Sequence, residues 1–438
     1  MKPLSKLCDA ADWFDPEFDR IVRTELAEEP RLHRKQWEFA QIFRALQSVG
    51  VLSGTSRGLS MGGGMERLLY AVVRHTGHLT VTDLYEADSS WDEARLEDPD
   101  CAVKAAAPFP VDRDRLSARR MDMRELTFPS GSFDFCYSSC AIEHIGTYDD
   151  FVRHLEETRR VLKDDGVYVL TTEFHYGEEV IPAPHNYYFS AAFLEELVRA
   201  SSFAVCGVVD GTLRPHVFNR PLPVNLGDLC ADAADPVTDV LLNTNPHLQL
   251  LTSGLPFTSM CLVLRKAAPA ASGRVLPMAG LAASREWMAA GVRRWKAFVE
   301  SASLHLDPFG MMSDRRTSGG VPRSVVSDGN STLFHTGYVW LGEMPRKLTV
   351  EVDARPAPGA RATIELRVHR HPALNPDAVS CCRSVKLVLE RRQRLHASVS
   401  IVPDAKHSFA VLGKVTAGSC EIFDVAVRVA ACPGAGST

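Results

Sequence analysis

Three consecutive glycines, Gly62, Gly63 and Gly64, separate an apolar run from a helix-like one in the segment RGLSMGGGMERLL at 57–69. Glycine costs backbone entropy on folding, so three in a row require a conformational or steric reason. A strand, a glycine turn and a helix let the backbone approach a ligand closely, with helix-end N–H groups nearby. The next apolar run, HLTVTDL, carries Asp83, whose carboxylate can accept hydrogen bonds from both hydroxyls of a ribose. Together these features indicate a nucleotide-type ligand, and a tight turn without a ligand is the alternative.

Residues suited to proton transfer follow two later apolar runs. Glu143 and His144 come after FDFCYSS, and His175 directly follows GVYVLTTEF. A hydroxyl stays protonated at neutral pH, so a reaction at its oxygen needs a group that accepts the proton. We take His175 as the candidate base, with substrate binding as its alternative, whereas Glu143 and His144 equally fit a role in ordering their loop. A further loop offers side chains for a lid, a sugar-stacking wall or ordinary packing, namely His185, Tyr187 and Tyr188.

The elements that must position these residues alternate along 51–266. Short apolar runs are separated by amphipathic stretches, which is the pattern of an α/β sheet with helices on both faces. This segment is therefore expected to form a doubly wound, Rossmann-like sheet. The segment before it, 1–50, is expected to be a helical lead-in, because RKQWEFAQIFRALQSVG has apolar residues near helical spacing, Trp37 among them, and stops at Gly50.

The last third of the chain has a different sequence pattern. Residues 267–305 begin with an Ala-, Pro- and Gly-rich stretch, and a connector helix is predicted after it. Residues 306–438 contain several runs that alternate apolar and polar side chains without helices between them, which predicts an antiparallel, jelly-roll-like β-sandwich domain. We favour core packing for its aromatic residues. A carbohydrate platform, a homo-oligomer interface or a docking surface for a pathway enzyme are the functional alternatives, and the candidate residues for the platform are His335, Tyr338, Trp340 and His369.

Composition narrows the class of protein. The chain has 438 residues, 45% of them hydrophobic and 24% charged, and its formal net charge of −5 gives no general reason to bind nucleic acid. Its eleven cysteines include no CxxC pair, which argues against a disulfide framework and a structural zinc site, so no metal is expected. No stretch is apolar enough for a signal peptide or a membrane span, and a cytoplasmic location is expected.

The ordered set of segments resembles the class I S-adenosylmethionine-dependent methyltransferases, in particular their small-molecule and glycan branch, of the type 11 kind. The resemblance covers about 33–266, and the motifs that carry it are the glycine turn, Asp83, Asp122 and FPSGSFDFCYSSCAIEHI. It implies a Rossmann-like fold, S-adenosylmethionine as cofactor and methyl transfer as the reaction. The segment RKQWEFAQIFRAL is also similar to the lead-in helix of a bacterial subgroup, in which that helix folds over the cofactor pocket.

The resemblance gives each motif a role toward the cofactor. The glycine turn passes under the methionine part, and Asp83 holds the ribose. Asp122 and Met123 meet the adenine, while Cys140 and Ala141 lie near the methyl group. The complete set of implied cofactor-binding residues is Gly62, Gly63, Gly64, Asp83, Leu84, Asp122, Met123, Cys140, Ala141 and Trp37.

Two positions depart from the usual form of the first motif. Ser60 stands where an acidic residue is common, and Glu66 stands where a third glycine is usual. Both departures are expected to weaken contacts to the amino group of the cofactor's methionine part.

The sequence thus predicts an enzyme that moves a methyl group from S-adenosylmethionine to an oxygen of a sugar, glycan or related small-molecule intermediate. The nitrogen of an amino sugar and a secondary-metabolite hydroxyl are alternative acceptors. A methyltransferase-fold binding protein without transfer activity is a hypothesis of a second class. An NAD-dependent oxidoreductase is disfavoured, because FDFCYSSCAIEHI and the late run SMCLVLRK fit the methyltransferase order.

Overall fold

The chain folds into two compact units. The computed structural model describes residues 2–85, 96–231, 235–266, 276–312, 331–372, 375 and 378–432. The first unit comprises Met1–Asn219, His247–Gln249 and Phe257–Met288, and the second comprises Arg220–Pro246, Leu250–Pro256 and Ala289–Thr438. The division falls within α8 (Leu281–Ser301), and much of the segment after Asn219 lies with the C-terminal strands. The domain limits expected from the sequence stay predictions, and 267–275 of the expected linker lies outside the described residues.

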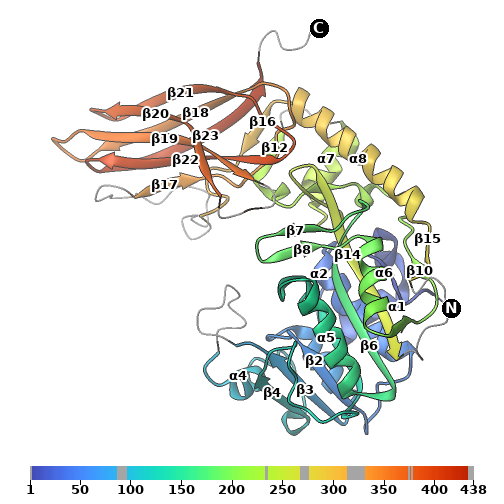
Figure 1. Ribbon diagram of the computed structural model, residues 1–438. Coiled ribbons are helices and arrows are strands. Elements are labelled where there is room, and N and C mark those ends of the chain that lie inside the picture. Colours follow the sequence, from blue (N-terminus) through green and yellow to red (C-terminus); the bar gives the residue numbers. More distant parts are fainter. Residues whose placement is uncertain are drawn as a thin grey trace. The chain divides into compact units, whose positions relative to one another are not determined.

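A mixed sheet forms the centre of the first unit (Figure 1). Its main path runs β15-β10-β1-β14-β6-β5-β2-β3-β4. The five strands that run parallel to one another are β2 (Arg57–Met61), β3 (His78–Asp83), β4 (Leu116–Arg120), β5 (Phe133–Ser139) and β6 (Leu162–His175). β14 (Leu255–Lys266) runs antiparallel to β6. The predicted Rossmann-like α/β fold is therefore confirmed.

Helices cover both faces of this sheet because the central strands are apolar on both sides. Phe135 and Tyr137 of β5 belong to one buried cluster, whereas Cys136 between them belongs to the other. The first cluster contains residues of α2 (Arg34–Ser48) and α3 (Arg67–Val73), and the second contains residues of α5 (Tyr148–Val161) and α6 (Ala191–Ala200). Two shorter α-helices of this unit are α1 (Pro16–Arg20) and α4 (Pro99–Ala105).

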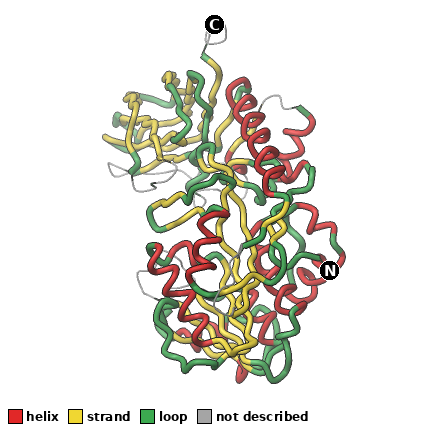
Figure 2. The backbone as a smooth tube through the Cα atoms, turned by 45° about the vertical axis from the view of Figure 1, so that its right-hand side comes forward, coloured by secondary structure: helices red, strands yellow, loops and turns green. Residues whose placement is uncertain are grey.

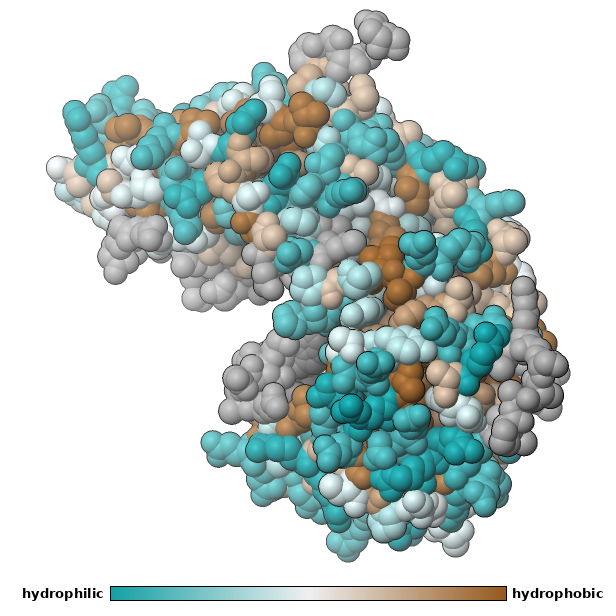
Figure 3. Space-filling view, in the orientation of Figure 1, coloured by the Kyte–Doolittle hydropathy of each residue, from teal (hydrophilic) through white to brown (hydrophobic). Residues whose placement is uncertain are grey.

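Local signals fix where the helices begin and end. At α5, Thr147 and Asp150 form a capping box, so that both otherwise unpaired N–H groups are satisfied. The outward side of α5 is polar, and Figure 3 shows a largely hydrophilic surface over it. At α2, the His33 ring accepts a hydrogen bond from the Lys35 N–H, and the helix is followed by Gly50, whose φ of 78° matches the predicted stop.

Very short strands extend the edge of the sheet beyond β14. β1 (Lys6–Leu7) pairs with β14 and with β10 (Val209–Asp210), which in turn pairs with β15 (Met278–Ala279). β9 (Phe203–Val205) pairs with the end of β14. A separate hairpin, β7 (Ile181–Ala183) and β8 (Asn186–Tyr188), follows β6. Segments from three distant parts of the chain thus build one edge.

The second unit is rich in antiparallel strands (Figure 2). One sheet has the order β12-β16-β23-β18-β21 and the other β17-β22-β19-β20. From β16 onward the chain changes sheets between successive strands except at the β19–β20 hairpin, which is the strand order of a jelly roll. The fold class predicted for this part is confirmed. The strands are β12 (Leu229–Ala231), β16 (Leu304–Leu306), β17 (Thr332–His335), β18 (Arg346–Pro356), β19 (Ala362–Pro372), β20 (Ser380–Leu389), β21 (Gln393–Ile401), β22 (His407–Ala417) and β23 (Cys420–Ala431).

The remaining elements of the second unit are small. They are α7 (Pro236–Thr244), β11 (Leu222–Pro223) and β13 (Leu250–Thr252). Trp340 is buried and its indole N–H donates to the carbonyl of Asp404, so this side chain is part of the core and offers no sugar platform. Among the described residues, no helix is long and apolar enough to cross a membrane.

Candidate active site

The three glycines form the turn between β2 and α3. Gly62 and Gly64 have φ values of 64° and 44°, in the left-handed region that favours glycine. A Cβ atom at Gly62 would lie 2.6 Å from Cβ of Ala141, and one at Gly63 would lie 2.5 Å from Oγ of Ser60. Glycine is therefore required here both by conformation and by close packing.

Asp83 ends β3 directly beside this turn. Its Oδ2 accepts a hydrogen bond of 2.9 Å from the Gly64 N–H, and its Oδ1 accepts one of 2.8 Å from the Leu84 N–H. Burial raises the pKa of Asp83, although these backbone donors act in the opposite direction. The Leu84 side chain is exposed. One hydrogen bond thus joins the glycine turn to Asp83, the residue predicted to bind the ribose.

Cys140 and Ala141 lie at the carboxyl end of β5, next to the glycine turn. Cys140 has a φ of 47°, which is unusual for a residue with a side chain and is common at functional sites. Its N–H donates to the carbonyl of Thr171, which holds this strained position in place. The predicted neighbours Gly62 and Ala141 therefore do meet in space.

Asp122 and Met123 occupy the loop after β4. The Asp122 carboxylate is held by Arg124, whose Nη2 lies 2.6 Å from Oδ2. Burial alone would raise the pKa of Asp122, but the hydrogen bonds from Arg124 lower it. Met123 is buried, and its carbonyl accepts from Nδ1 of His154. Their predicted role toward adenine stays a prediction.

Trp37, expected to contact the cofactor, lies in the core instead. It is fully buried, and its indole N–H donates to Oδ2 of Asp12 at 2.6 Å. Asp12 in turn pairs with Lys6, so Trp37 ties α2 to the N-terminal segment. The helical spacing of apolar residues predicted that Trp37 is buried. It could not distinguish a position in the core from one in the wall of a ligand pocket.

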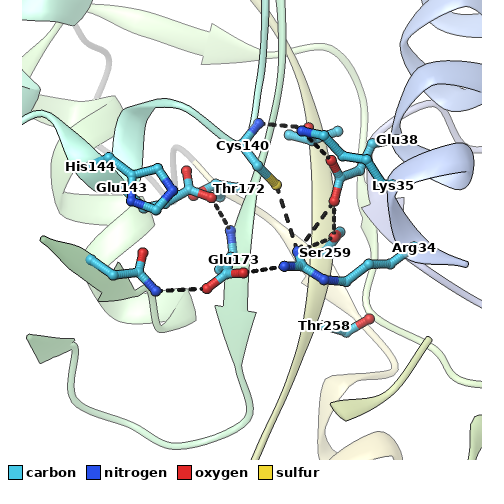
Figure 4. Close-up of polar contacts among 12 residues, drawn as sticks. Arg34, Lys35, Glu38, Cys140, Glu143, His144, Thr172, Glu173, Thr258 and Ser259 are labelled. Atoms are coloured by element: carbon cyan, nitrogen blue, oxygen red, sulfur yellow. Dashed lines mark hydrogen bonds and ion pairs between the residues drawn. The ribbon is translucent and has the colours of Figure 1, made fainter. Parts of the chain in front are cut away.

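Charged residues of α2 that the sequence did not single out face the carboxyl ends of β5 and β6 and the amino-terminal half of β14 (Figure 4). Glu38 is fully buried and lies 3.3 Å from Arg34 Nη1 and 3.2 Å from Lys35 Nζ. Its carboxylate also accepts hydrogen bonds from the hydroxyls of Ser139 and Ser259. Burial alone would raise the pKa of Glu38, but the charges of Lys35 and Arg34 lower it. Glu38 thus joins α2 to two strands of the sheet.

Arg34 also forms an ion pair with Glu173, near the end of β6. Both side chains are largely buried, with exposed fractions of 17% and 9%. The second carboxylate oxygen of Glu173 accepts a hydrogen bond of 2.8 Å from Asn186, on β8. The Arg34 guanidinium lies 3.9 Å from the sulfur of Cys140, so this pair borders the place predicted for the methyl group.

Glu143 and His144 lie in a short 3₁₀ helix after β5 (Ile142–His144). Glu143 is fully buried and accepts hydrogen bonds from the Thr172 hydroxyl at 3.0 Å and the Glu173 N–H at 3.2 Å. Burial raises the pKa of Glu143, and the charge of His144 opposes that shift. His144 Nδ1 lies 2.7 Å from the carbonyl of His185, to which it donates, so the acceptor lone pair of the neutral ring is on Nε2.

His175, the preferred base on sequence grounds, is placed unfavourably for that role. It is 1% exposed, its Nδ1 accepts from the Gly177 N–H at 3.1 Å, and its Nε2 lies 2.6 Å from the carbonyl of Glu179. Since Nδ1 accepts and Nε2 donates, neither ring nitrogen is available to take a proton from a substrate. Burial also lowers the pKa of His175. Its role is to fix the turn after β6, and we correct the earlier assignment on this ground.

Among the described residues, no group of three or more His, Cys, Asp or Glu side chains is arranged to hold a metal ion. The site lies at the carboxyl edge of the parallel strands, as in nucleotide-dependent enzymes. It combines a glycine turn, an acidic residue at the end of β3 and a polar cluster at the ends of β5 and β6.

Comparison with known proteins agrees with this geometry. Residues 59–170 match the family model described as a methyltransferase domain. The chain thus contains a methyltransferase domain, and the enzyme class predicted from the sequence and its cofactor, S-adenosylmethionine, are confirmed. No curated protein sequence matches the chain.

Several solved structures are similar to parts of the chain. A putative sarcosine dimethylglycine methyltransferase from Galdieria sulphuraria has 12% identity and a TM-score of 0.34, with 57% of this chain and 98% of that one covered. An S-adenosylmethionine-dependent methyltransferase from Mesorhizobium loti has 15% identity and a TM-score of 0.32, with coverages of 51% and 96%. A geranyl diphosphate C-methyltransferase from Streptomyces coelicolor has 13% identity and a TM-score of 0.34, with coverages of 60% and 88%.

Proposed function

We propose that the enzyme transfers a methyl group to a hydroxyl oxygen of a sugar, glycan or related small hydroxylated molecule. The observation that carries this proposal is the polar character of the site beyond Cys140. A buried ion pair, Arg34 with Glu173, and the Asn186 amide lie together there. Charged and amide groups of this kind recognise hydroxyls by hydrogen bonds, and the buried Oδ1 of Asn186 has no partner within the described residues, so an apolar acceptor would leave it unsatisfied.

The residues present fit the cofactor. The glycine turn leaves no room for side chains between Ser60 and Ala141, and a carboxylate stands at the end of β3. In this proposal Gly62, Gly63, Gly64, Asp83, Leu84, Asp122, Met123, Cys140 and Ala141 would hold S-adenosylmethionine. When bound, it supplies a methyl group activated by a positively charged sulfur.

In the proposed mechanism the protein aligns the acceptor and removes its proton. Arg34 and Glu173 hold the hydroxylated molecule so that one oxygen faces the methyl carbon. When the acceptor oxygen is methylated, its hydroxyl proton would pass to the imidazole of His144. Glu143, buried beside His144, stabilises the imidazolium by its negative charge. This arrangement moves the role of base from His175 to His144.

The role of the second unit is a separate proposal. We propose that its jelly-roll sheets bind the acceptor glycan, a second copy of the chain or another enzyme of the same pathway, in the cytoplasm. Its sheet order supports this proposal, since jelly rolls occur among lectin domains.

The proposed function is tested with S-adenosylmethionine labelled in its methyl group. The enzyme is incubated with panels of free sugars, nucleotide sugars, amino sugars, glycans and phenolic metabolites, and the products are separated by mass. We expect label in an ether linkage of a sugar. Label on nitrogen or on a phenol would replace the acceptor class, and cofactor binding without transfer to any acceptor would favour the binding-protein hypothesis.

A further inference from the structure

Glu66 is an acidic residue in an unexpected place. It lies two residues after Gly64, at the N-cap position of α3, where the resembled family usually has a glycine. Ser60, at the end of β2, stands where that family usually has an acid. The chain therefore keeps one carboxylate at this turn but carries it on a different residue.

Only one of the two oxygens of the Glu66 carboxylate has a polar partner in the described part of the chain. Its Oε1 lies 3.1 Å from Nζ of Lys35, on α2, while its Oε2 is buried without a hydrogen-bond partner in the described part of the chain. The side chain is 17% exposed. A buried carboxylate oxygen without a donor costs free energy, so such an atom in a native protein calls for an explanation.

Lys35 bridges this carboxylate to the end of β5. Its ammonium group lies 3.1 Å from both the carbonyl and the hydroxyl oxygen of Ser139, and 3.2 Å from Oε2 of Glu38. Ser139 directly precedes Cys140. The Lys35–Glu66 pair thus links the start of α3 to the end of β5, beside the predicted position of the methyl group.

A positive and a negative group side by side are complementary to a zwitterion. We propose that Oε2 of Glu66 accepts a hydrogen bond from the ammonium group of the cofactor's methionine part, while Lys35 faces the neighbouring carboxylate. The inference deepens the proposed methyl-transfer function and rests on its cofactor. In this role Glu66 takes over the position that Ser60 leaves without charge.

The electrostatics around Glu66 agree with recognition of a cationic group. Burial raises the pKa of Glu66 to about 7, and the like charges of Glu38 and Asp83 act in the same direction, while Lys35 opposes them. A bound ammonium group would favour the ionised form. The affinity of the wild-type protein for the cofactor product should therefore rise between pH 6 and pH 8, where the ligand's amino group stays protonated.

Calorimetry with two ligands tests the proposal. S-adenosylhomocysteine carries the amino-acid group, whereas 5′-methylthioadenosine has the same nucleoside and sulfur without it. We expect Glu66→Gln to weaken S-adenosylhomocysteine binding about 10- to 100-fold, the loss of a charge-assisted hydrogen bond, and to abolish its rise with pH. Binding of 5′-methylthioadenosine should stay within twofold. Glu157→Gln, which alters an ion-paired carboxylate on α5, serves as the control and should change neither affinity.

The outcomes separate this inference from the function on which it rests. Equal losses for both ligands would overturn the inference, because Glu66 would then only shape the turn. Unchanged affinity for both would overturn it as well, since the Lys35–Glu66 pair would then only connect α2 to α3. A wild-type protein that binds neither ligand at any pH would refute the cofactor itself, whatever Glu66 does.

Discussion

Replacing Asp83 by alanine should separate ribose recognition from the rest of the site. In the structure this carboxylate already accepts the Gly64 and Leu84 N–H groups, one on each oxygen. A carboxylate has about four acceptor sites, so each oxygen keeps a lone pair for a ribose hydroxyl. The substitution therefore removes the proposed ligand contacts and loosens the glycine turn that lies under the methionine part.

The size of the effect follows from these contacts. Hydrogen bonds to a charged group contribute about 1.5–3 kcal/mol. Loss of this amount of net binding energy corresponds to a roughly 10- to 150-fold weaker complex. Asp83→Asn keeps one oxygen acceptor and the side-chain size, so its loss should be smaller. Both variants should also have a lower melting temperature, because the Gly64 N–H loses its charged acceptor.

The assay is calorimetric titration with S-adenosylhomocysteine and with its 2′,3′-dideoxyribose analogue, at a temperature where every variant is folded. The wild-type protein should prefer the natural ligand, and Asp83→Ala should lose most of that preference. Asp164→Ala, at an exposed carboxylate, is the control. If Asp83→Ala still prefers the natural ligand as strongly as the wild type does, Asp83 does not bind the ribose and the reasoning fails.

Three further predictions concern catalysis, stability and the extent of the first unit. His144→Ala should lower turnover about 100-fold with unchanged affinity for S-adenosylhomocysteine. His175→Ala should instead lower the melting temperature and leave the turnover of the folded enzyme within a few-fold. The reverse result would restore His175 as the base. Arg34→Met should cost about 3–5 kcal/mol of unfolding free energy in urea titrations, because it leaves Glu173 buried without its cation, and a cost below about 1 kcal/mol would mean that solvent reaches the pair. A fragment of residues 1–288 should bind S-adenosylhomocysteine in calorimetry. A fragment that stops at 275 should be less stable in thermal unfolding because it lacks β15. Equal stability of the two fragments would show that the sheet edge formed by β15 is dispensable.

The parallel core of the first unit could be predicted because its signals are local. Runs such as FDFCYSS and GVYVLTTEF are apolar on both sides and are separated by amphipathic stretches, which is what a sheet covered on both faces requires. The edge strands β1, β10 and β15 have two residues each, too few to show any period. β22 carries a weak signal for a different reason. Gly413 interrupts its apolar pattern, and glycine is needed there because a Cβ atom would lie 2.2 Å from the Phe334 ring.

The candidate site was only partly predictable for a similar reason. The glycine turn and Asp83 are motifs that can be recognised in one stretch of sequence. Arg34 and Glu38, one helical turn apart, have the spacing of an exposed ion pair on a helix. They are buried because their other partners, Glu173 and Ser259, come from strands far along the chain. For His175, the end of a strand predicts proximity to the site but not the direction of the ring.

The two-residue strand β1 has a consequence for how the protein is made. Lys6 is translated long before its sheet partners, Asp210 and Cys261. During synthesis the N-terminal segment must wait, unpaired, until most of the first unit has been translated. Contacts between residues so distant in sequence slow folding and prolong the exposure of apolar surface. We therefore expect expression of this enzyme to depend on slow translation or on chaperones that hold nascent chains, more than its final stability would indicate.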